Sequence, residues 1–202
     1  MTTSFDGRPL AELIIRPAAP DRWDDIVQVF GRRASNPDSC WCQRFRTHDE
    51  PSNRDALQGE VDSATVPIGL LAYLDDVPIG WTRVVPRATL PGILKNRALR
   101  RVLDDDPDGW WVTCFAVRPE HHGIGVSLEL LRAAAEQART NGASVLEGHP
   151  VDVKRLQASR VSASALFTGV LTTFESAGFR EIGRTYPSRP VMRLQLHSGD
   201  PD

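Results

Sequence analysis

The sequence has few cysteines and no long hydrophobic run. Cys40, Cys42 and Cys114 are its three cysteines, an odd and small number that argues against a disulfide framework and indicates a reducing compartment. The longest apolar run, residues 67–74, is far shorter than the ~20 residues that span a bilayer. Residues 1–12 lack the basic start and apolar core of a signal peptide. We therefore expect a cytoplasmic protein with no membrane partner.

The chain also lacks an excess of charge of either sign. Its 24 lysines and arginines and 26 aspartates and glutamates give a formal net charge of −2. A basic field that would hold a polyanion is missing, so nucleic acid is not an expected partner. With 41% hydrophobic and 25% charged residues, a chain of 202 residues is most simply one globular domain, residues 1–202 with a core of about 12–197.

Short apolar runs bounded by turn residues alternate with segments of helical periodicity. Strands are predicted at residues 13–18, 66–74, 77–87, 110–117, 143–148, 179–186 and 190–196. Helices are predicted at about 21–33, 54–61 and 125–140, with a further helix that ends at 177–178. This order predicts an α/β or α+β fold, a mixed sheet with helices on both faces.

The junction between the strand 110–117 and the helix 125–140 carries the clearest functional signal. The strand is apolar on both alternations, as expected of a central strand covered on both faces. Gly123 and Gly125 then lead into the helix, whose first amides and positive dipole end form a favourable phosphate site. The glycines are equally compatible with a simple turn into the helix. Their spacing alone leaves both interpretations open.

One family that matches this outline is the dinucleotide-binding fold. It requires G-x-G-x-x-G directly after the strand and an acidic residue about 20 positions later. Glu147 would serve as the acid, but Leu128 stands where the third glycine is required. Residues 118–122 also separate the strand from the glycines, and only one βαβ unit is present. The dinucleotide interpretation is therefore the weakest of those considered.

A second family fits better. The stretch FAVRPEHHGIGVSLELLRAAAEQARTNGASVLEGHPVD resembles the central motif of the GNAT superfamily of acyl-CoA N-acyltransferases, which reads strand, V-x-P, then [RQ]-x-x-G-x-[GA] at the start of a helix. The later FESAGFREIGR, the amino-terminal strand and helix, and the hairpin at 66–87 follow the order of the family. The resemblance spans almost the whole chain and implies a central mixed β-sheet flanked by helices on both faces.

The resemblance implies acetyl-CoA as the co-substrate and no metal. Its pyrophosphate is expected on the amides of the glycine loop, and its pantetheine arm beside the preceding strand, where a backbone N–H near Ala116 or Val117 would stabilise the oxyanion. The acceptor is expected to be a primary amine of a small molecule or a protein, and a homodimer is possible as a habit of the family. The cofactor-binding residues implied are Phe115, Ala116, Val117, His122, Gly123, Ile124, Gly125, Val126, Ser127 and Phe174.

The sequence departs from the family at several positions. His122 replaces the usual Arg or Gln, and Ser127 the usual Gly or Ala, but a loop that binds through its backbone tolerates both. Phe174 stands where a tyrosine often protonates the departing thiolate. Because a thiol with a pKa of about 8.5 leaves tolerably as a thiolate, activity remains compatible with this loss. A catalytically silent acyl-CoA-binding or sensor protein is the alternative.

Two residues at the end of the strand 143–148 are predicted to take the proton of the attacking amine, Glu147 and His149. An amine with a lysine-like pKa of about 10.4 arrives protonated, so a base or a water chain is required. Each residue also has a structural interpretation: Glu147 in an ion pair or cap, His149 as a hydrogen-bonded loop residue. Lys154, Arg155 and Arg160 follow; they either contact the 3′-phosphate of CoA, cover the acceptor site, or are solvated charges.

Overall fold

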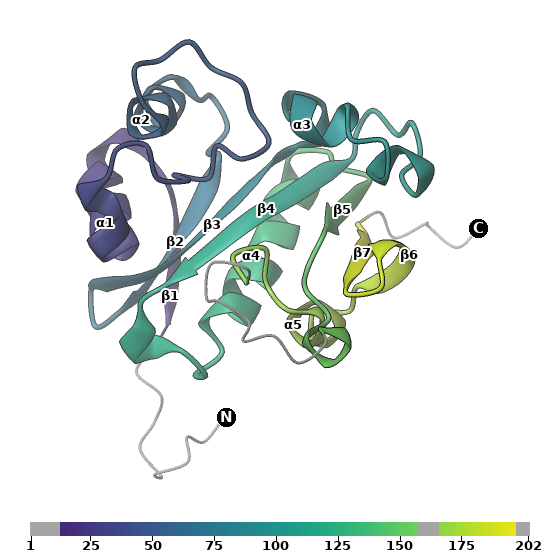
Figure 1. The fold of residues 1–202 in the computed structure, drawn as a ribbon. Helices are drawn as coiled ribbons and strands as arrows, with labels where there is room; N and C mark the ends of the chain where they lie inside the picture. Colours follow the sequence, from purple (N-terminus) through teal and green to yellow (C-terminus); the bar gives the residue numbers. More distant parts are fainter. Residues whose placement is uncertain (1–12, 157–165, 197–202) are drawn as a thin grey trace, which may run out of the picture.

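In the computed structural model, which describes residues 13–156 and 166–196, the strands form one seven-stranded mixed sheet (Figure 1). The spatial order is β1-β2-β3-β4-β5-β7-β6. β4 and β5 pair in parallel, and the other neighbouring strands pair antiparallel. The bounds are β1 Ile14–Pro17, β2 Gly69–Leu74, β3 Val77–Pro86, β4 Trp110–Val117, β5 Val145–Gly148, β6 Arg180–Tyr186 and β7 Arg189–Gln195.

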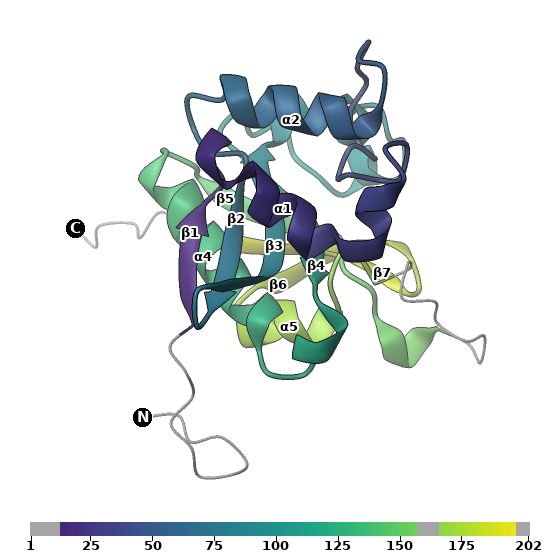
Figure 2. The ribbon, with the colours of Figure 1, turned by 90° about the vertical axis from the view of Figure 1, so that its left-hand side faces the viewer.

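Helices cover both faces of the sheet, which confirms the predicted architecture (Figures 1 and 2). On one face lie α1 and α2, and on the other lie α4 and α5. Among the described helices, none combines the length and the apolar character needed to cross a bilayer. The bounds are α1 Trp23–Phe30, α2 Asn53–Ser63, α3 Pro91–Leu94, α4 Val126–Thr140 and α5 Leu171–Ser176.

β4 is the central strand, and its side chains are divided between cores on the two faces of the sheet. Trp110, Val112 and Phe115 pack in the core beneath α4, while Cys114 and Ala116 pack in the core beneath α1. All five are buried. A strand covered on both faces favours apolar residues on both alternations, and this explains the run, interrupted only by Thr113, that predicted it. The glycine loop therefore follows a strand that is buried on both faces.

β4 and β5 separate after only three paired positions. Trp110 to Val112 of β4 pair with Leu146 to Gly148 of β5, and beyond them β4 continues without its parallel neighbour. The segment 167–170 lies against the free edge: the Phe115 amide donates a 2.6 Å hydrogen bond to the Phe167 carbonyl, and Val170 bridges to Val151. The opening between β4 and β5 is thus bordered by residues 167–170, which come after β5 in the chain.

A disulfide joins the segment between α1 and α2 to the central strand. Cys42 and Cys114, 72 positions apart, are bonded, so the expectation that the cysteines stay unpaired was wrong. Cys40 remains a free, exposed thiol. Trp41, fully buried, stacks on Phe30 with ring centroids 4.8 Å apart. The sequence count could not reveal this pair because only folding brings the segment over β4.

Candidate active site

The glycine loop adopts a conformation that only glycine takes without strain. After β4 the chain makes a short 3₁₀ turn, Pro119–His121, and then Gly123 and Gly125 have φ angles of +83° and +92°. A Cβ added at either glycine would meet no atom within 4 Å. The requirement is therefore for a left-handed backbone, and the space above the loop is open.

The amides of residues 123–127 have no backbone acceptor in the described chain. The first amide of α4 with such a partner is that of Leu128, which donates to the Gly125 carbonyl at 2.9 Å. The loop is also solvent-accessible, with Ile124 at 50% exposure. Unpaired amides at the positive end of a 15-residue helix form a site for a phosphate group.

His122 ties the loop back to the strand. Its Nε2 lies 2.9 Å from the Val117 carbonyl oxygen. A carbonyl only accepts, so Nε2 carries the hydrogen in this contact. The side chain thus fixes the loop against the end of β4, while the loop amides stay available for a ligand.

The register of β3 and β4 decides which amides of β4 face the opening. The Arg118 amide donates to the Ile79 carbonyl at 2.9 Å, and Trp81 lies opposite Ala116. Because hydrogen bonds alternate along an antiparallel pair, the Ala116 amide points to β3, whereas those of Phe115 and Val117 point away from it. The Phe115 amide is engaged by Phe167. Of the two positions predicted for the oxyanion donor, only Val117 directs its amide toward the opening.

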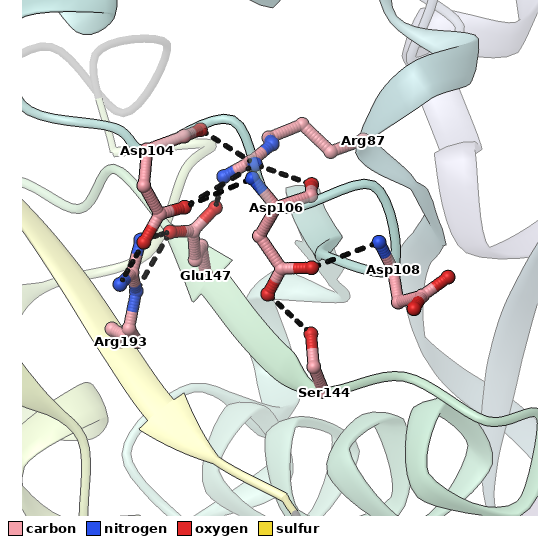
Figure 3. A network of polar contacts seen from close by, with 7 residues as sticks. All are labelled: Arg87, Asp104, Asp106, Asp108, Ser144, Glu147 and Arg193. Atoms are coloured by element: carbon pink, nitrogen blue, oxygen red, sulfur yellow. Dashed lines mark hydrogen bonds and ion pairs between the residues drawn. The ribbon is translucent and has the colours of Figure 1, made fainter.

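Glu147 lies in a buried ion network (Figure 3). The side chain is fully buried, and its two oxygens accept hydrogen bonds from Arg87 at 2.5 Å and from Arg193 Nε at 2.9 Å. Arg193 also donates to Asp104 at 2.6 Å, and this bond holds the pKa of the Asp104 carboxyl below its ordinary value. Both oxygens of Glu147 are therefore occupied by cations, an environment that favours a structural role over proton transfer.

His149, two positions later, lies in a different environment. It follows β5 and lines a cavity of about 200 Å³. Its Nε2 is 2.7 Å from the Thr185 hydroxyl oxygen. Burial, and then the charges of Arg189 and Arg44, lower the pKa of His149 to about 4. The imidazole is therefore neutral near pH 7 and has a lone pair with which to accept a proton.

The cavity is formed by segments that are distant in the sequence. Arg44 and Phe45 come from the segment between α1 and α2, and Arg189 begins β7. Phe167 joins the cavity to the edge of β4, since the same residue accepts from Phe115. Sequence analysis missed Arg44, Phe45 and Arg189 because none of the three lies in a motif. The lining residues are Arg44, Phe45, Asn96, Ala98, Leu99, His149, Phe167, Thr168, Thr185, Tyr186 and Arg189.

Phe174, predicted near the cofactor, is a fully buried residue of the core. Its ring meets that of Phe115 edge-on at 6.2 Å and that of Phe179 at 5.0 Å. A Cβ on Gly148 would collide with the Phe174 ring, so β5 needs glycine at its end. The Phe174 ring therefore packs directly against the backbone of β5 at Gly148 and sets the distance between β5 and α5.

The remaining predictions concern basic residues and metals. Arg155 lies 3.6 Å from the Asp152 carboxylate, while Arg160 lies outside the described residues. Within residues 13–156 and 166–196, no group of three or more histidine, cysteine or acidic side chains is placed to hold a metal ion.

Comparison with known proteins identifies a family for most of this framework. Residues 33–158, more than half of the chain, match the model of the acetyltransferase (GNAT) family. The sequence matches none of the curated proteins. The family match covers β2 to β5 and the glycine loop, and it includes Arg44 and His149.

Solved structures share the fold over nearly the whole chain. The GNAT domain of PAT from S. lividans has a TM-score of 0.57 at 17% identity, covering 95% of this chain and 93% of its own. A GCN5-related N-acetyltransferase from Kribbella flavida has a TM-score of 0.55 at 18% identity over 91% and 98%. The yncA protein of Salmonella typhimurium, solved with acetyl-CoA, has a TM-score of 0.54 at 19% identity over 94% and 98%.

Proposed function

Because the chain belongs to the acetyltransferase (GNAT) family, it is an acyltransferase, and we propose that it transfers the acetyl group of acetyl-CoA directly to a primary amine. The observation that carries the proposal is the row of amides at residues 123–127, at the amino end of α4, which have no backbone acceptor among the residues that the structure describes. The acetyl-CoA found in the yncA structure supports the same co-substrate here. The acceptor amine belongs to a small molecule or a protein.

The residues of the glycine loop fit the pyrophosphate of CoA. An anion with two phosphates needs several donors on one side and room for its own bulk. The five amides supply the donors, and the empty space above Gly123 and Gly125 supplies the room. The pantetheine arm would follow the free edge of β4, where binding at Phe115 requires the Phe167 carbonyl to release its amide.

The geometry of two groups supports a role for them in the chemistry of acyl transfer. Acetyl-CoA supplies the activated thioester. The Val117 amide, directed away from β3, would donate to the oxygen on which negative charge develops, a contribution of roughly 3 kcal/mol in well-studied enzymes. His149, neutral and held by Thr185, would take the proton of the amine. Glu147 holds the strands that carry these groups.

The test is a pair of glycine variants with calorimetry. Gly125→Ala and Gly142→Ala place the same methyl group at opposite ends of α4, at φ angles of +92° and +81°, and neither methyl meets an atom within 4 Å. Both variants should lose similar stability, since both strain the backbone. Only Gly125→Ala should lose CoA affinity. Equal CoA affinity in the two variants would contradict the proposal that the glycine loop binds the pyrophosphate of CoA.

Turnover is then measured as thiol released from acetyl-CoA across a panel of primary amines. Thiol release that depends on the amine supports the transferase. CoA binding without turnover on any amine supports the catalytically silent alternative.

A further inference from the structure

We infer that the acceptor is a small primary amine that also carries an anionic group, a carboxylate or a phosphate, and that Arg44 and Arg189 bind this group. The inference rests on the proposed function, because it assigns the 200 Å³ cavity beside His149 to the acceptor. Two arginines, Arg44 and Arg189, line this cavity, and its described lining contains no aspartate or glutamate. An amine with a second cationic group would meet like charges there.

Arg44 is oriented by aromatic rings. Its guanidinium carbon lies 5.0 Å from the centroid of the Phe167 ring and 6.0 Å from that of Phe45. Stacking on a ring occupies the face of the guanidinium and leaves the N–H groups in its plane free to donate. Within the described residues Arg44 forms no ion pair with a carboxylate. A bound carboxylate or phosphate would match this planar set of donors.

Arg189, at the start of β7, is held by a hydrogen bond. Its Nη1 donates to the Thr168 hydroxyl at 2.9 Å. Burial, and then the charge of Arg44, lower the pKa of Arg189. Each arginine therefore raises the electrostatic cost of the other, and an anion between them would relieve this repulsion.

The same anion would improve His149 as a base. After burial, the charges of Arg189 and Arg44 are what hold the pKa of His149 at about 4. A general base works best when its pKa lies near the working pH. An anionic group that compensates the two arginines would raise the pKa of His149 toward its ordinary value, so that the correct acceptor also prepares the base.

The size of the cavity limits the acceptor. About 200 Å³ is below the roughly 300–1,000 Å³ of sites for drug-sized ligands. Phe45, Leu99 and Phe167 supply apolar walls, and Thr168, Thr185 and Asn96 supply polar groups. Such a site fits a short chain with an amine at one end and an anion at the other.

The test uses amines that differ only at the far end. Propylamine, β-alanine and 1,3-diaminopropane present a methyl group, a carboxylate and a second ammonium on similar chains, and ethanolamine with O-phosphoethanolamine tests the phosphate. Binding to the full chain is measured by calorimetry with CoA present, and turnover by thiol release. The variants are Arg44→Gln, Arg189→Gln and Arg189→Lys, with Arg132→Gln as the control, since Arg132 is exposed on α4 and pairs with Glu129.

β-Alanine should bind about tenfold or more tightly than propylamine, and O-phosphoethanolamine than ethanolamine, as expected for charge-assisted hydrogen bonds. Arg44→Gln and Arg189→Gln should each abolish most of this preference, Arg189→Lys should restore part of it, and Arg132→Gln should leave it intact. Arg44 is exposed, so its variant carries the test should Arg189→Gln fail to fold. β-Alanine and O-phosphoethanolamine distinguish a carboxylate from a phosphate.

Two results would overturn the inference. The first is equal binding of amines whose far end is anionic and amines whose far end is uncharged. The second is a preference for the anionic far end that persists when both Arg44 and Arg189 are replaced. The binding measurement separates this failure from failure of the proposed function. Preferred binding of anionic amines without thiol release would retain the anion site and reject acetyl transfer. Thiol release only with amines whose far end is uncharged, propylamine and ethanolamine, would retain acetyl transfer and reject the anion site.

Discussion

The glycine loop follows β4, and the cavity that we propose for the acceptor adjoins His149 after β5, yet the two are built in opposite ways. The loop and the first turn of α4, residues 118–127, are contiguous in the sequence, and the groups that we propose to bind the cofactor there are backbone amides. The cavity is assembled from separate segments, and the groups that we propose to act there are the side chains of Arg44, His149 and Arg189. A site made of contiguous backbone keeps its function when side chains vary, and this explains why His122 and Ser127 can depart from the family pattern.

The cavity, by contrast, depends on how distant segments are held together. Glu147 and Arg193 fix β5 to β7, and the Cys42–Cys114 bond fixes the wall that carries Arg44 to β4. Disturbing these links should therefore affect the acceptor side strongly and the cofactor side weakly. The predictions below test this contrast.

The largest effect is expected from Glu147→Gln. It leaves Arg87 and Arg193 facing a neutral group in the interior, and breaking a buried pair in this way costs about 3–5 kcal/mol of unfolding free energy. Urea unfolding measures the loss. Glu136→Gln is the control, because its pair with Arg139 is exposed and should contribute less than about 1 kcal/mol. A Glu147→Gln protein of normal stability with a greatly reduced rate would instead identify Glu147 as the base.

The next effect concerns the disulfide. Replacing Cys42 and Cys114 by alanine opens a covalent loop between residues 72 positions apart and should lower the unfolding free energy by roughly 2–4 kcal/mol. KM for the amine should rise because Arg44 loses its anchor, while CoA affinity should hold. Cys40→Ala, at an exposed free thiol, is the matched control. A parallel loss of CoA affinity would show that the glycine loop and the cavity proposed for the acceptor are not independent.

A third effect is a dependence of stability on pH. The pKa of His149 is lowered from 6.5 to about 4 in the folded chain, so between these values the unfolded state binds a proton that the native state does not. This contribution to stability is complete above about pH 6.5 and is lost as the pH falls toward 4, amounting to roughly 3 kcal/mol. His149→Asn should remove this part of the pH dependence, whereas His48→Asn, at an exposed site, should keep it. Coinciding wild-type and His149→Asn profiles would contradict the burial of a neutral imidazole.

Most of the fold was predictable because its signals are local. The bounds of β4 agree with the predicted strand 110–117, and α4 begins one residue after the predicted start. A strand buried on both faces leaves an unbroken apolar run, and an amphipathic helix leaves a periodic one. Gly123 and Gly125 were visible for the same reason, since a left-handed backbone leaves a glycine in the sequence.

The acceptor side was not predictable in the same way. Nothing near Cys42 indicates Cys114 as its partner, and nothing near Arg44 indicates Arg189. Each pair meets only because the sheet brings distant segments together, and side-chain contact of that kind leaves no period or spacing. His149 was selected by its place after β5, whereas its lowered pKa depends on burial and then on the charges of Arg189 and Arg44, none of which the sequence revealed.

The smallest effect is expected from Thr185→Val, which keeps the shape of the side chain and removes the hydroxyl that meets His149 Nε2 at 2.7 Å. A lost hydrogen bond of this kind contributes about 0.5–1.5 kcal/mol, so kcat should fall a few-fold up to about tenfold. Thr185 positions the imidazole, and its loss should change kcat and its pH profile while leaving CoA affinity unchanged. Thr140→Val, at an exposed threonine near the end of α4, provides the control. An unchanged kcat and pH profile in Thr185→Val would separate His149 from the proton transfer, and the acceptor cavity would then recognise the amine without providing the base.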